Sequence, residues 1–206
     1  MHRNATVTRN LIAINVIIFI ATLLNENYMM GSFALFYPGS HYFRWWQIVT
    51  HMFMHGGFWH IFFNMYTLYM FGSVVEEIIG SRKFLIYYFV CGLGAAGLHL
   101  GVEALQVTFF AAALPPVVGA SGAIFGVIIA FAMLFPESRL TLLFPPVTMK
   151  ARTMVIVFAA IELFTGVTGF ADGIAHFAHL GGMLFGWLMI RYWRKKGTLF
   201  NEYGQY

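Results

Sequence analysis

The fold of this chain is decided by residues 118–135, which read VGASGAIFGVIIAFAMLF and contain no charged side chain. A transmembrane helix requires about 20 mostly apolar residues, with a range of about 17–25, and the stretch meets that requirement. It carries one polar residue, Ser121, near its beginning, and a pair of glycines spaced four apart, Gly122 and Gly126. We therefore predict a membrane-spanning helix from about Val118 to Phe135.

The rest of the chain has the same character. Hydrophobic residues make up 60% of the 206 residues and charged residues 10%, against about 25% charged residues in a soluble domain. This composition excludes a soluble enzyme, a disordered tail and a nucleic-acid binder, and the single cysteine, Cys91, excludes an intramolecular disulfide. Five more stretches are apolar enough to span, so we predict an all-α membrane protein of six transmembrane helices in one domain, residues 1–206. The five are Asn10–Leu24, Phe58–Ile79, Phe84–Leu105, Thr153–Phe170 and Gly173–Trp193.

The first predicted span resembles a signal peptide, because Arg3 and Arg9 precede a short apolar core. No small-x-small cleavage site follows it, so we interpret it as a span. Residues 25–57 are too mixed in polarity to cross a membrane, and they carry Trp45 and Trp46. Such rings favour the membrane–water interface, so we predict a structured loop lying on or in the outer leaflet.

The positive charges predict the orientation. With six spans and a cytoplasmic N-terminus, eleven of the twelve Lys and Arg residues fall on the inner side, and only Arg44 falls outside. Cytoplasmic loops carry an excess of Lys and Arg, so we predict that both termini are cytoplasmic. The inner residues are Arg3, Arg9, Arg82, Lys83, Arg139, Lys150, Arg152, Arg191, Arg194, Lys195 and Lys196.

Three of the predicted helices place polar residues at a similar depth. Counting at 1.5 Å per residue from the outer side puts Ser121 about one turn into its span, and Asn64 and His179 each roughly 9 Å into theirs. His60 then lies near the outer surface. Polar and ionisable residues inside a membrane are costly, which makes each a functional candidate.

Glycines predict which helices approach each other. Gly182 and Gly186 share the helix face of His179, and the span of Ser121 has its own pair. Small residues four apart allow close helix packing in lipid. If these two spans pack together, Ser121 and His179 come within hydrogen-bond reach, which is the minimal nucleophile–base pair for acyl transfer. Phe125 is placed to stack on the imidazole.

Candidates for the remaining catalytic groups lie at a similar depth to Ser121 and His179. His60 and Asn64 lie four residues apart on one face and are candidate donors for an oxyanion, together with the backbone N–H of Ser121. We expect no Asp or Glu on a matching face, so the base is predicted to work in a Ser–His dyad. Glu76 is interpreted as a structural anchor at the inner end of its span. Glu162 counts to a deeper level than His179, and we favour a structural role for it over a catalytic one.

Simpler readings compete with this hypothesis. A serine among glycines is often only a packing residue, and a lone histidine is often a satisfied core residue. His51, His55 and His60 are an alternative metal-ligand set, but no HExxH motif, Cys cluster or carboxylate accompanies them. We therefore expect no metal and no cofactor. His55 and His176 are expected to hydrogen-bond the backbone.

Three motifs, taken together, give the chain a specific resemblance. They are HGGFWHIFFN at residues 55–64, GASG at residues 119–122 and AHLGGMLFG at residues 178–186. The chain resembles the rhomboid family of intramembrane serine proteases over a core of about residues 11–193. The resemblance implies a six-helix rhomboid-like bundle with Ser121 as nucleophile and His179 as general base. It also implies that His60 and Asn64 stabilise the oxyanion and that Glu76 is structural.

The resemblance further implies an integral, multi-pass protein, which we expect in a bacterial inner membrane, with transmembrane proteins as substrates cut near the outer leaflet. The alternative is a catalytically inactive rhomboid-like protein that binds and escorts membrane helices. A transporter is a third class, for which the sequence offers no inverted repeat. The family often carries Trp-Arg in its first loop, where this chain has Trp46-Gln47. Because Gln lacks the charged fork of Arg, we expect that loop to be anchored more loosely or differently.

Overall fold

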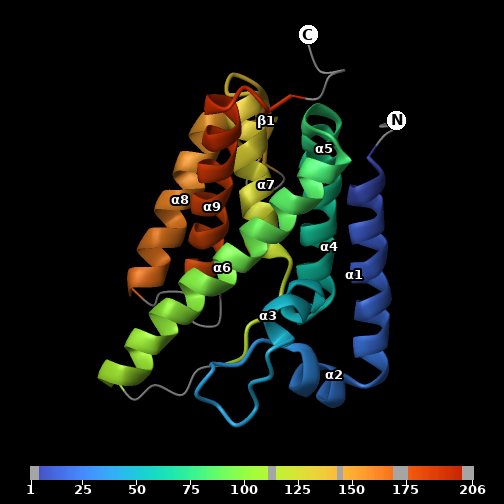
Figure 1. Cartoon of the computed structure of the whole chain (residues 1–206), viewed down its shortest axis with the longest axis vertical. Coiled ribbons are helices and arrows are strands. Elements are labelled where there is room, and N and C mark those ends of the chain that lie inside the picture. The colour runs from blue at the N-terminus through green and yellow to red at the C-terminus, as the bar shows by residue number, and fades with distance from the viewer. Residues whose placement is uncertain (1–4, 111–114, 143–145, 169–175, 201–206) are drawn as a thin grey trace.

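The computed structural model describes residues 5–110, 115–142, 146–168 and 176–200, and these form a helical bundle with one short hairpin (Figure 1). The elements in chain order are α1 (Thr6–Leu24), α2 (Glu26–Phe33), α3 (Gln47–Thr50), the 3-10 turn η1 (His51–Phe53), α4 (Phe58–Thr67), the π-helical turn η2 (Leu68–Gly72), α5 (Ser73–Ile79), α6 (Ser81–Phe110), α7 (Ser121–Leu134), β1 (Arg139–Thr141), β2 (Thr148–Lys150), α8 (Ala151–Thr168) and α9 (His176–Lys195).

Five of the six predicted spans are helical wherever the structure describes them. The fourth is shorter than predicted, because α7 begins at Ser121 rather than Val118 and ends at Leu134 rather than Phe135. By length and composition, three helices can cross a membrane, namely α1, residues 81–109 of α6, and α8, while α7 is apolar but shorter. The predicted end of the fifth span at Phe170 and the start of the sixth at Gly173 lie outside the described residues. The second predicted span is continuous from Phe58 to Ile79, although η2 interrupts its α-helical hydrogen bonding.

The prediction of an all-α fold misses one element. Strands β1 and β2 pair antiparallel, with Arg139 opposite Lys150. Each strand has only three residues, which is too short for an alternating pattern to stand out in the sequence. Lys150 and Arg152 both lie 2.7 Å from the carboxylate of Glu137 and tie the hairpin to the start of α8.

The centre of the bundle is formed by α6, α7 and α9, which pack extensively against one another, whereas α8 lies at one edge and α1 at the other (Figure 1). Helix α8 contacts chiefly α9, α7 and strand β2. The hydroxyl of the fully buried Tyr87 on α6 donates a hydrogen bond to the carbonyl of Gly126 on α7 at 2.6 Å. Helix α7 also contacts η2, where the centroids of the Phe131 and Phe71 rings are 4.9 Å apart.

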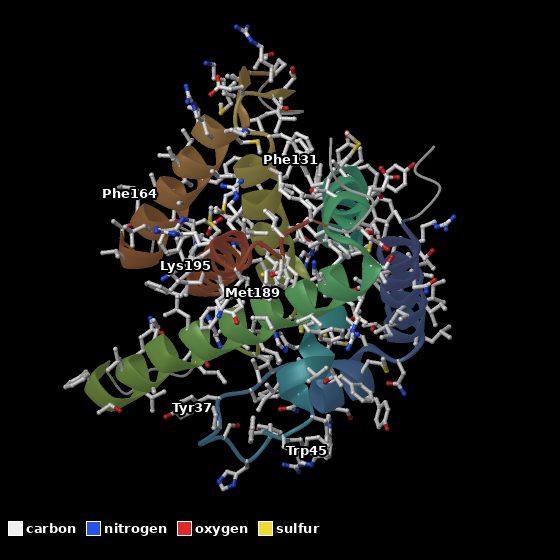
Figure 2. The ribbon with its side chains drawn as sticks, turned by 45° about the horizontal axis from the view of Figure 1, so that its top comes forward. Tyr37, Trp45, Phe131, Phe164, Met189 and Lys195 are labelled. Carbon is white, nitrogen blue, oxygen red and sulfur yellow. The ribbon has the colours of Figure 1, made fainter. Side chains whose placement is uncertain are left out.

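The outer faces of the edge helices are apolar and exposed. Leu24 on α1 and Val167 on α8 are 83% and 72% exposed, and Phe164 points away from the bundle on the outer side of α8 (Figure 2). Exposed apolar surface on this scale requires a cover. The hydrocarbon of a bilayer provides one, which agrees with the composition.

Glu76 is a structural anchor, as predicted. Its buried carboxylate accepts hydrogen bonds from the backbone N–H groups of Val7 and Thr8 at 2.9 and 2.7 Å. It also accepts from the hydroxyls of Thr8 and Ser81 at 2.7 and 2.6 Å. The first N–H groups of a helix have no partner within the helix. Glu76 therefore caps α1 and fastens it to α5 and to the start of α6.

Gln47 holds the first loop together from the inside. Its side chain is fully buried, accepts a hydrogen bond from the N–H of Arg44 at 2.9 Å and donates to the carbonyl of Tyr42 at 3.1 Å. The loop is also pinned to the segment before α7, because Leu35 and Val117 exchange backbone hydrogen bonds at 2.9 and 2.8 Å. Where the resemblance implies an Arg side chain, the neutral amide of Gln47 thus anchors the loop differently, through hydrogen bonds to the backbone.

The described Lys and Arg residues gather at one end of the bundle, with Arg44 as the exception. They lie at the start of α1, at the α5–α6 junction, in the hairpin, at the start of α8 and at the end of α9, which meet at the top of Figure 1. Arg3 lies outside the described residues. The loop with α2 and α3 lies at the opposite end.

Candidate active site

Ser121 is the first residue of α7, at the end of the bundle that carries α2 and α3. The chain approaches it through Gly119, whose φ of 134° is one that L side chains rarely adopt. The N–H of Gly119 donates to the carbonyl of His51 at 2.9 Å, so the first loop fixes the backbone two residues before the serine. At this helix N-terminus the N–H of Ser121 has no acceptor within its own helix and is available to a ligand.

Glycines bring α7 and α9 into contact, as predicted. A Cβ added to Gly182 would lie 1.8 Å from the carbonyl oxygen of Gly122, and one added to Gly186 would lie 3.0 Å from the Cα of Gly126. The two helix backbones therefore touch at two successive levels. The predicted approach of the polar pair is confirmed: the hydroxyl of Ser121 lies 2.8 Å from Nε2 of His179.

The ring of His179 is held on its flat side. Phe125, one turn below Ser121, stacks on the imidazole with the ring centroids 4.3 Å apart and an interplanar angle of 12°. His179 is 9% exposed. The stack leaves the imidazole free to move only within its own plane, so the direction of its nitrogen atoms depends on what contacts its far edge.

That far edge meets a carboxylate, and the expectation that no acidic residue shares the layer is wrong. Oε1 of Glu162, from α8, lies 3.0 Å from Nδ1 of His179. The oxygen lies off the direction of the ring N–H, so this is a close polar contact rather than an aligned hydrogen bond. The depth estimate failed because it counted from the inner end of α8. Counted from Thr168, the last described residue of α8, Glu162 is roughly 9 Å from the outer end, close to the level of His179.

A second histidine shares this carboxylate. Nδ1 of His176 lies 2.6 Å from Oε2 of Glu162 and 3.1 Å from the hydroxyl of Thr165. The expectation that His176 hydrogen-bonds the backbone overlooked this contact. Ligand atoms of Glu162, His176 and His179 all lie within 4.8 Å of one another, a spacing that can hold a metal ion. It shares no residue with the metal-ligand set considered from the sequence, which was His51, His55 and His60.

The histidines of that earlier set have other surroundings. His51 bonds through Nδ1 to the carbonyl of Gln47 at 2.9 Å. Burial lowers the pKa of His51 to about 4, and it lowers the pKa of His55 to about 4 as well. The ring of His55 packs edge-on against that of His60 at 5.0 Å. The backbone of Phe53 acts on the pKa of this ring as a hydrogen bond would, although within the described residues no bond of ordinary geometry forms, so the backbone bond of His55 stays a prediction.

His60 directs a ring N–H toward the serine. The N–H of Gly56 donates to Nδ1 of His60 at 3.4 Å, so Nδ1 is the acceptor and the proton of the neutral ring sits on Nε2. A Cβ placed on Gly119 would lie 2.9 Å from that Nε2 and 3.4 Å from the hydroxyl oxygen of Ser121. The two groups therefore border the same small space, which only a glycine at this position leaves open.

Asn64 lies one turn further along the same face of α4. Its side chain is 8% exposed, and among the described residues its amide nitrogen has no acceptor. A buried donor without a partner costs about 1–3 kcal/mol, which is the kind of cost that a functional site carries. A small cavity lies beside Ser121 and is bordered also by His51 and Gly119. Its volume of about 10 Å³ is close to the smallest that can hold one water molecule.

Comparison with known proteins gives a consistent picture. A family profile described as the Rhomboid domain matches residues 42–196. The chain is 34% identical over 143 residues to the mitochondrial presenilin-associated rhomboid-like protein of Mus musculus, covering 68% of this chain and 36% of that protein. It is 31% identical over 149 residues to the putative rhomboid protease YdcA of Bacillus subtilis, covering 71% of this chain and 66% of that protein.

A third relative is the rhomboid protease GluP of Bacillus subtilis, which is 29% identical over 143 residues, covering 69% of this chain and 25% of that protein. The chain thus matches between about a quarter and two thirds of the length of these relatives. The matched region contains α3 through α9 and every residue of the site described above. With its apolar helices this makes the chain a multi-pass membrane protein, and it belongs to the rhomboid family.

Proposed function

We propose that this protein is an intramembrane serine endopeptidase that cleaves transmembrane segments of other proteins near the outer side of the membrane. The observation that carries the proposal is the 2.8 Å contact between the hydroxyl of Ser121 and Nε2 of His179. Family membership supports it, since two of the relatives are named as rhomboid proteases.

The reaction follows from the pair. The oxygen of Ser121 attacks the scissile carbonyl carbon while its proton passes to Nε2 of His179. The same proton then goes to the leaving amine as the C–N bond breaks, which leaves an acyl-enzyme. A water molecule, deprotonated by His179, attacks the ester and releases the new carboxyl end of the substrate, so that Ser121 regains its proton.

The developing oxyanion needs hydrogen-bond donors, and we propose three for this role. They are the Nε2–H of His60, the amide of Asn64 and the backbone N–H of Ser121 itself. Donors that are already fixed in place stabilise a developing charge without having to reorganise during the reaction. The stacked Phe125 restricts the base in the same way.

We further propose six spans with both termini cytoplasmic, in a bacterial cell membrane. The gathering of positive residues at the end of the bundle opposite the site supports this orientation. The site then faces the outer side, at the depth of one or two helical turns. A transmembrane substrate must unwind locally there, because a helix engages its carbonyls in hydrogen bonds. We expect small or helix-breaking residues near the cleaved bond.

The test is cleavage of a labile single-span substrate by the purified protein in liposomes, comparing wild type with Ser121→Ala. We expect the wild type to cut once, on the outer side, and Ser121→Ala to lose cleavage while keeping its melting temperature. A fluorophosphonate should label the wild type and not Ser121→Ala. If the wild type binds the substrate but does not cut it, the protein is instead an inactive, helix-binding rhomboid-like protein.

A further inference from the structure

The carboxylate of Glu162 is the one feature of the site that the Ser–His pair does not use. It reaches α9 from the neighbouring helix α8 and contacts two imidazoles at once, with Oε1 3.0 Å from Nδ1 of His179 and Oε2 2.6 Å from Nδ1 of His176. A carboxylate inside a membrane is costly and is kept only where it has partners or work to do. Its partners here include the catalytic base.

The hydrogen bonds around His176 indicate where the protons sit. The hydroxyl of Thr165 donates to the carbonyl of Ile161 at 2.7 Å, as is usual for a helical threonine, so it offers lone pairs to His176. An ionised carboxylate also has only acceptors. Nδ1 of His176 therefore carries a proton and donates it to the Glu162 carboxylate, which keeps that side chain in place.

The same reasoning applies to His179. Its Nδ1 faces the other oxygen of the carboxylate, which favours the tautomer with the proton on Nδ1. In that tautomer Nε2 has a free lone pair, and Nε2 is the atom 2.8 Å from the hydroxyl of Ser121. The opposite tautomer would present an N–H to the serine and could not take its proton. A negative charge at this distance also stabilises the imidazolium that forms during the reaction.

We propose, on the basis of the function proposed above, that Glu162 is a positioning residue that sets the tautomer and in-plane direction of His179. The catalytic pair is then supported by a carboxylate as in a Ser–His–Glu triad, with His176 fastening that carboxylate. Because Oε1 lies off the line of the His179 N–H, the effect is smaller than in triads with an aligned bond, where replacing the acid by its amide lowers kcat by about 10⁴.

The kinetic test compares Glu162→Gln, Glu162→Asp and Glu103→Gln in liposomes. In Glu162→Gln the amide N–H₂ can point at Nδ1 and draw the His179 proton to Nε2, so we expect kcat to fall by between about 10-fold and about 10⁴-fold, with KM within about twofold. Glu162→Asp restores the charge and should recover part of the loss. Glu103→Gln is the matched control, since Glu103 is a buried glutamate 3.1 Å from His99 on α6, outside the site. It should keep the wild-type kcat.

A spectroscopic test reads the proton directly. In protein with ¹⁵N-labelled histidine and Ser121→Ala, ring nitrogen shifts distinguish Nδ1–H from Nε2–H, and the His179 signals are identified by their loss in His179→Ala. We expect the Nδ1–H form, and a shift toward Nε2–H when Glu162→Gln is added. A structural role alone would change the melting temperature without changing the tautomer.

The outcomes separate this inference from the proposed function. If Ser121→Ala abolishes cleavage while Glu162→Gln keeps the wild-type kcat, or if the tautomer of His179 does not respond to Glu162→Gln, Glu162 is only a packing residue and the protease assignment stands. If Ser121→Ala cleaves as well as the wild type, the proposed function itself fails.

Discussion

The backbones of Gly122 and Gly182 touch so closely that a methyl group on Gly182 would lie 1.8 Å from the carbonyl oxygen of Gly122. Real Cβ atoms do not approach oxygen atoms at that distance, and the obstacle is backbone rather than a flexible side chain. The contact therefore sets the separation of α7 from α9, and with it the distance between Ser121 and His179.

This contact predicts the result of Gly182→Ala. To accommodate the methyl group the two helices must move apart, which lengthens the 2.8 Å contact between Ser121 and His179. We expect cleavage and fluorophosphonate labelling to fall by at least about 10²-fold, the cost of about 1 Å of misplacement. Gly97→Ala is the control, because a Cβ there meets nothing within 4 Å. Wild-type labelling in Gly182→Ala would show that the contact does not set the catalytic distance.

The oxyanion donors predict a non-additive pair of changes. Removing one donor of a rigid oxyanion hole costs about 10²–10³ in kcat. Here His60→Ala or Asn64→Ala alone leaves two donors, so we expect smaller single effects and a much larger loss of kcat in the double variant. Turnover of the double variant near that of the wild type would remove both residues from the mechanism.

The network at Glu76 predicts a loss of stability rather than of chemistry. Glu76→Gln keeps one acceptor oxygen and replaces the other by an N–H₂ group. Either the two donors of Thr8 or the donors of Val7 and Ser81 then lose their acceptor. We expect destabilisation by about 3 kcal/mol, measured by thermal unfolding in detergent. Glu137→Gln breaks only exposed ion pairs, which solvent screens, so its melting temperature should stay close to that of the wild type. Equal melting temperatures for the two variants would contradict the anchoring role.

The buried His51 predicts acid sensitivity. Its pKa is about 4 in the folded protein against the ordinary 6.5, so the unfolded chain binds a proton more readily between these values. The contribution is fully present above pH 6.5 and is lost as the pH falls toward 4, and the loss amounts to about 2 kcal/mol at pH 5. Thermal unfolding at pH 7 and pH 5 should show a smaller difference in His51→Gln, while the same change at the exposed His41 should leave the difference unchanged. An unaltered difference in His51→Gln would mean that His51 does not titrate on unfolding.

The serine mechanism predicts that chelators have no effect. Glu162, His176 and His179 are spaced to hold a metal ion, but a metal on Nδ1 of His179 would force the ring proton onto Nε2 and block the base. We therefore expect full cleavage in EDTA. Loss of cleavage in EDTA followed by recovery with Zn²⁺ would replace the serine mechanism with a metal mechanism.

Much of the site was predictable because it depends on local periodicity. The glycine pairs at 122, 126, 182 and 186 lie on single helix faces, so the meeting of Ser121 and His179 followed from their spacing. The stacking of Phe125 followed from its position four residues after Ser121. These predictions needed only the rise of a helix and the rule that small residues permit close approach.

Glu162 was misplaced because its partner lies on another helix. A depth counted along α8 from Arg152, at the inner end, accumulates error over ten residues. The contact of Glu162 with His179 depends instead on where α8 ends and on how it packs against α9. No residue pattern predicts the hydrogen bond from the N–H of Gly56 to Nδ1 of His60, which fixes the tautomer of His60. Hydrogen bonds across a loop depend on backbone directions that no periodic pattern encodes. The hairpin was missed because its three-residue strands are too short to show an alternating pattern.

Helix α8 supplies Glu162 from the edge of the bundle, where it packs chiefly against α9, α7 and the hairpin. Ser121 and His179 belong to α7 and α9, which pack against each other and against α6 at the centre of the bundle, whereas the carboxylate belongs to a helix at its edge. An outward swing of α8 of a few ångströms would leave the nucleophile and its base in contact while removing the charge that orients the base. The folded protein would then have two levels of activity. The lipid or substrate helix packed against α8 would determine which of them is populated.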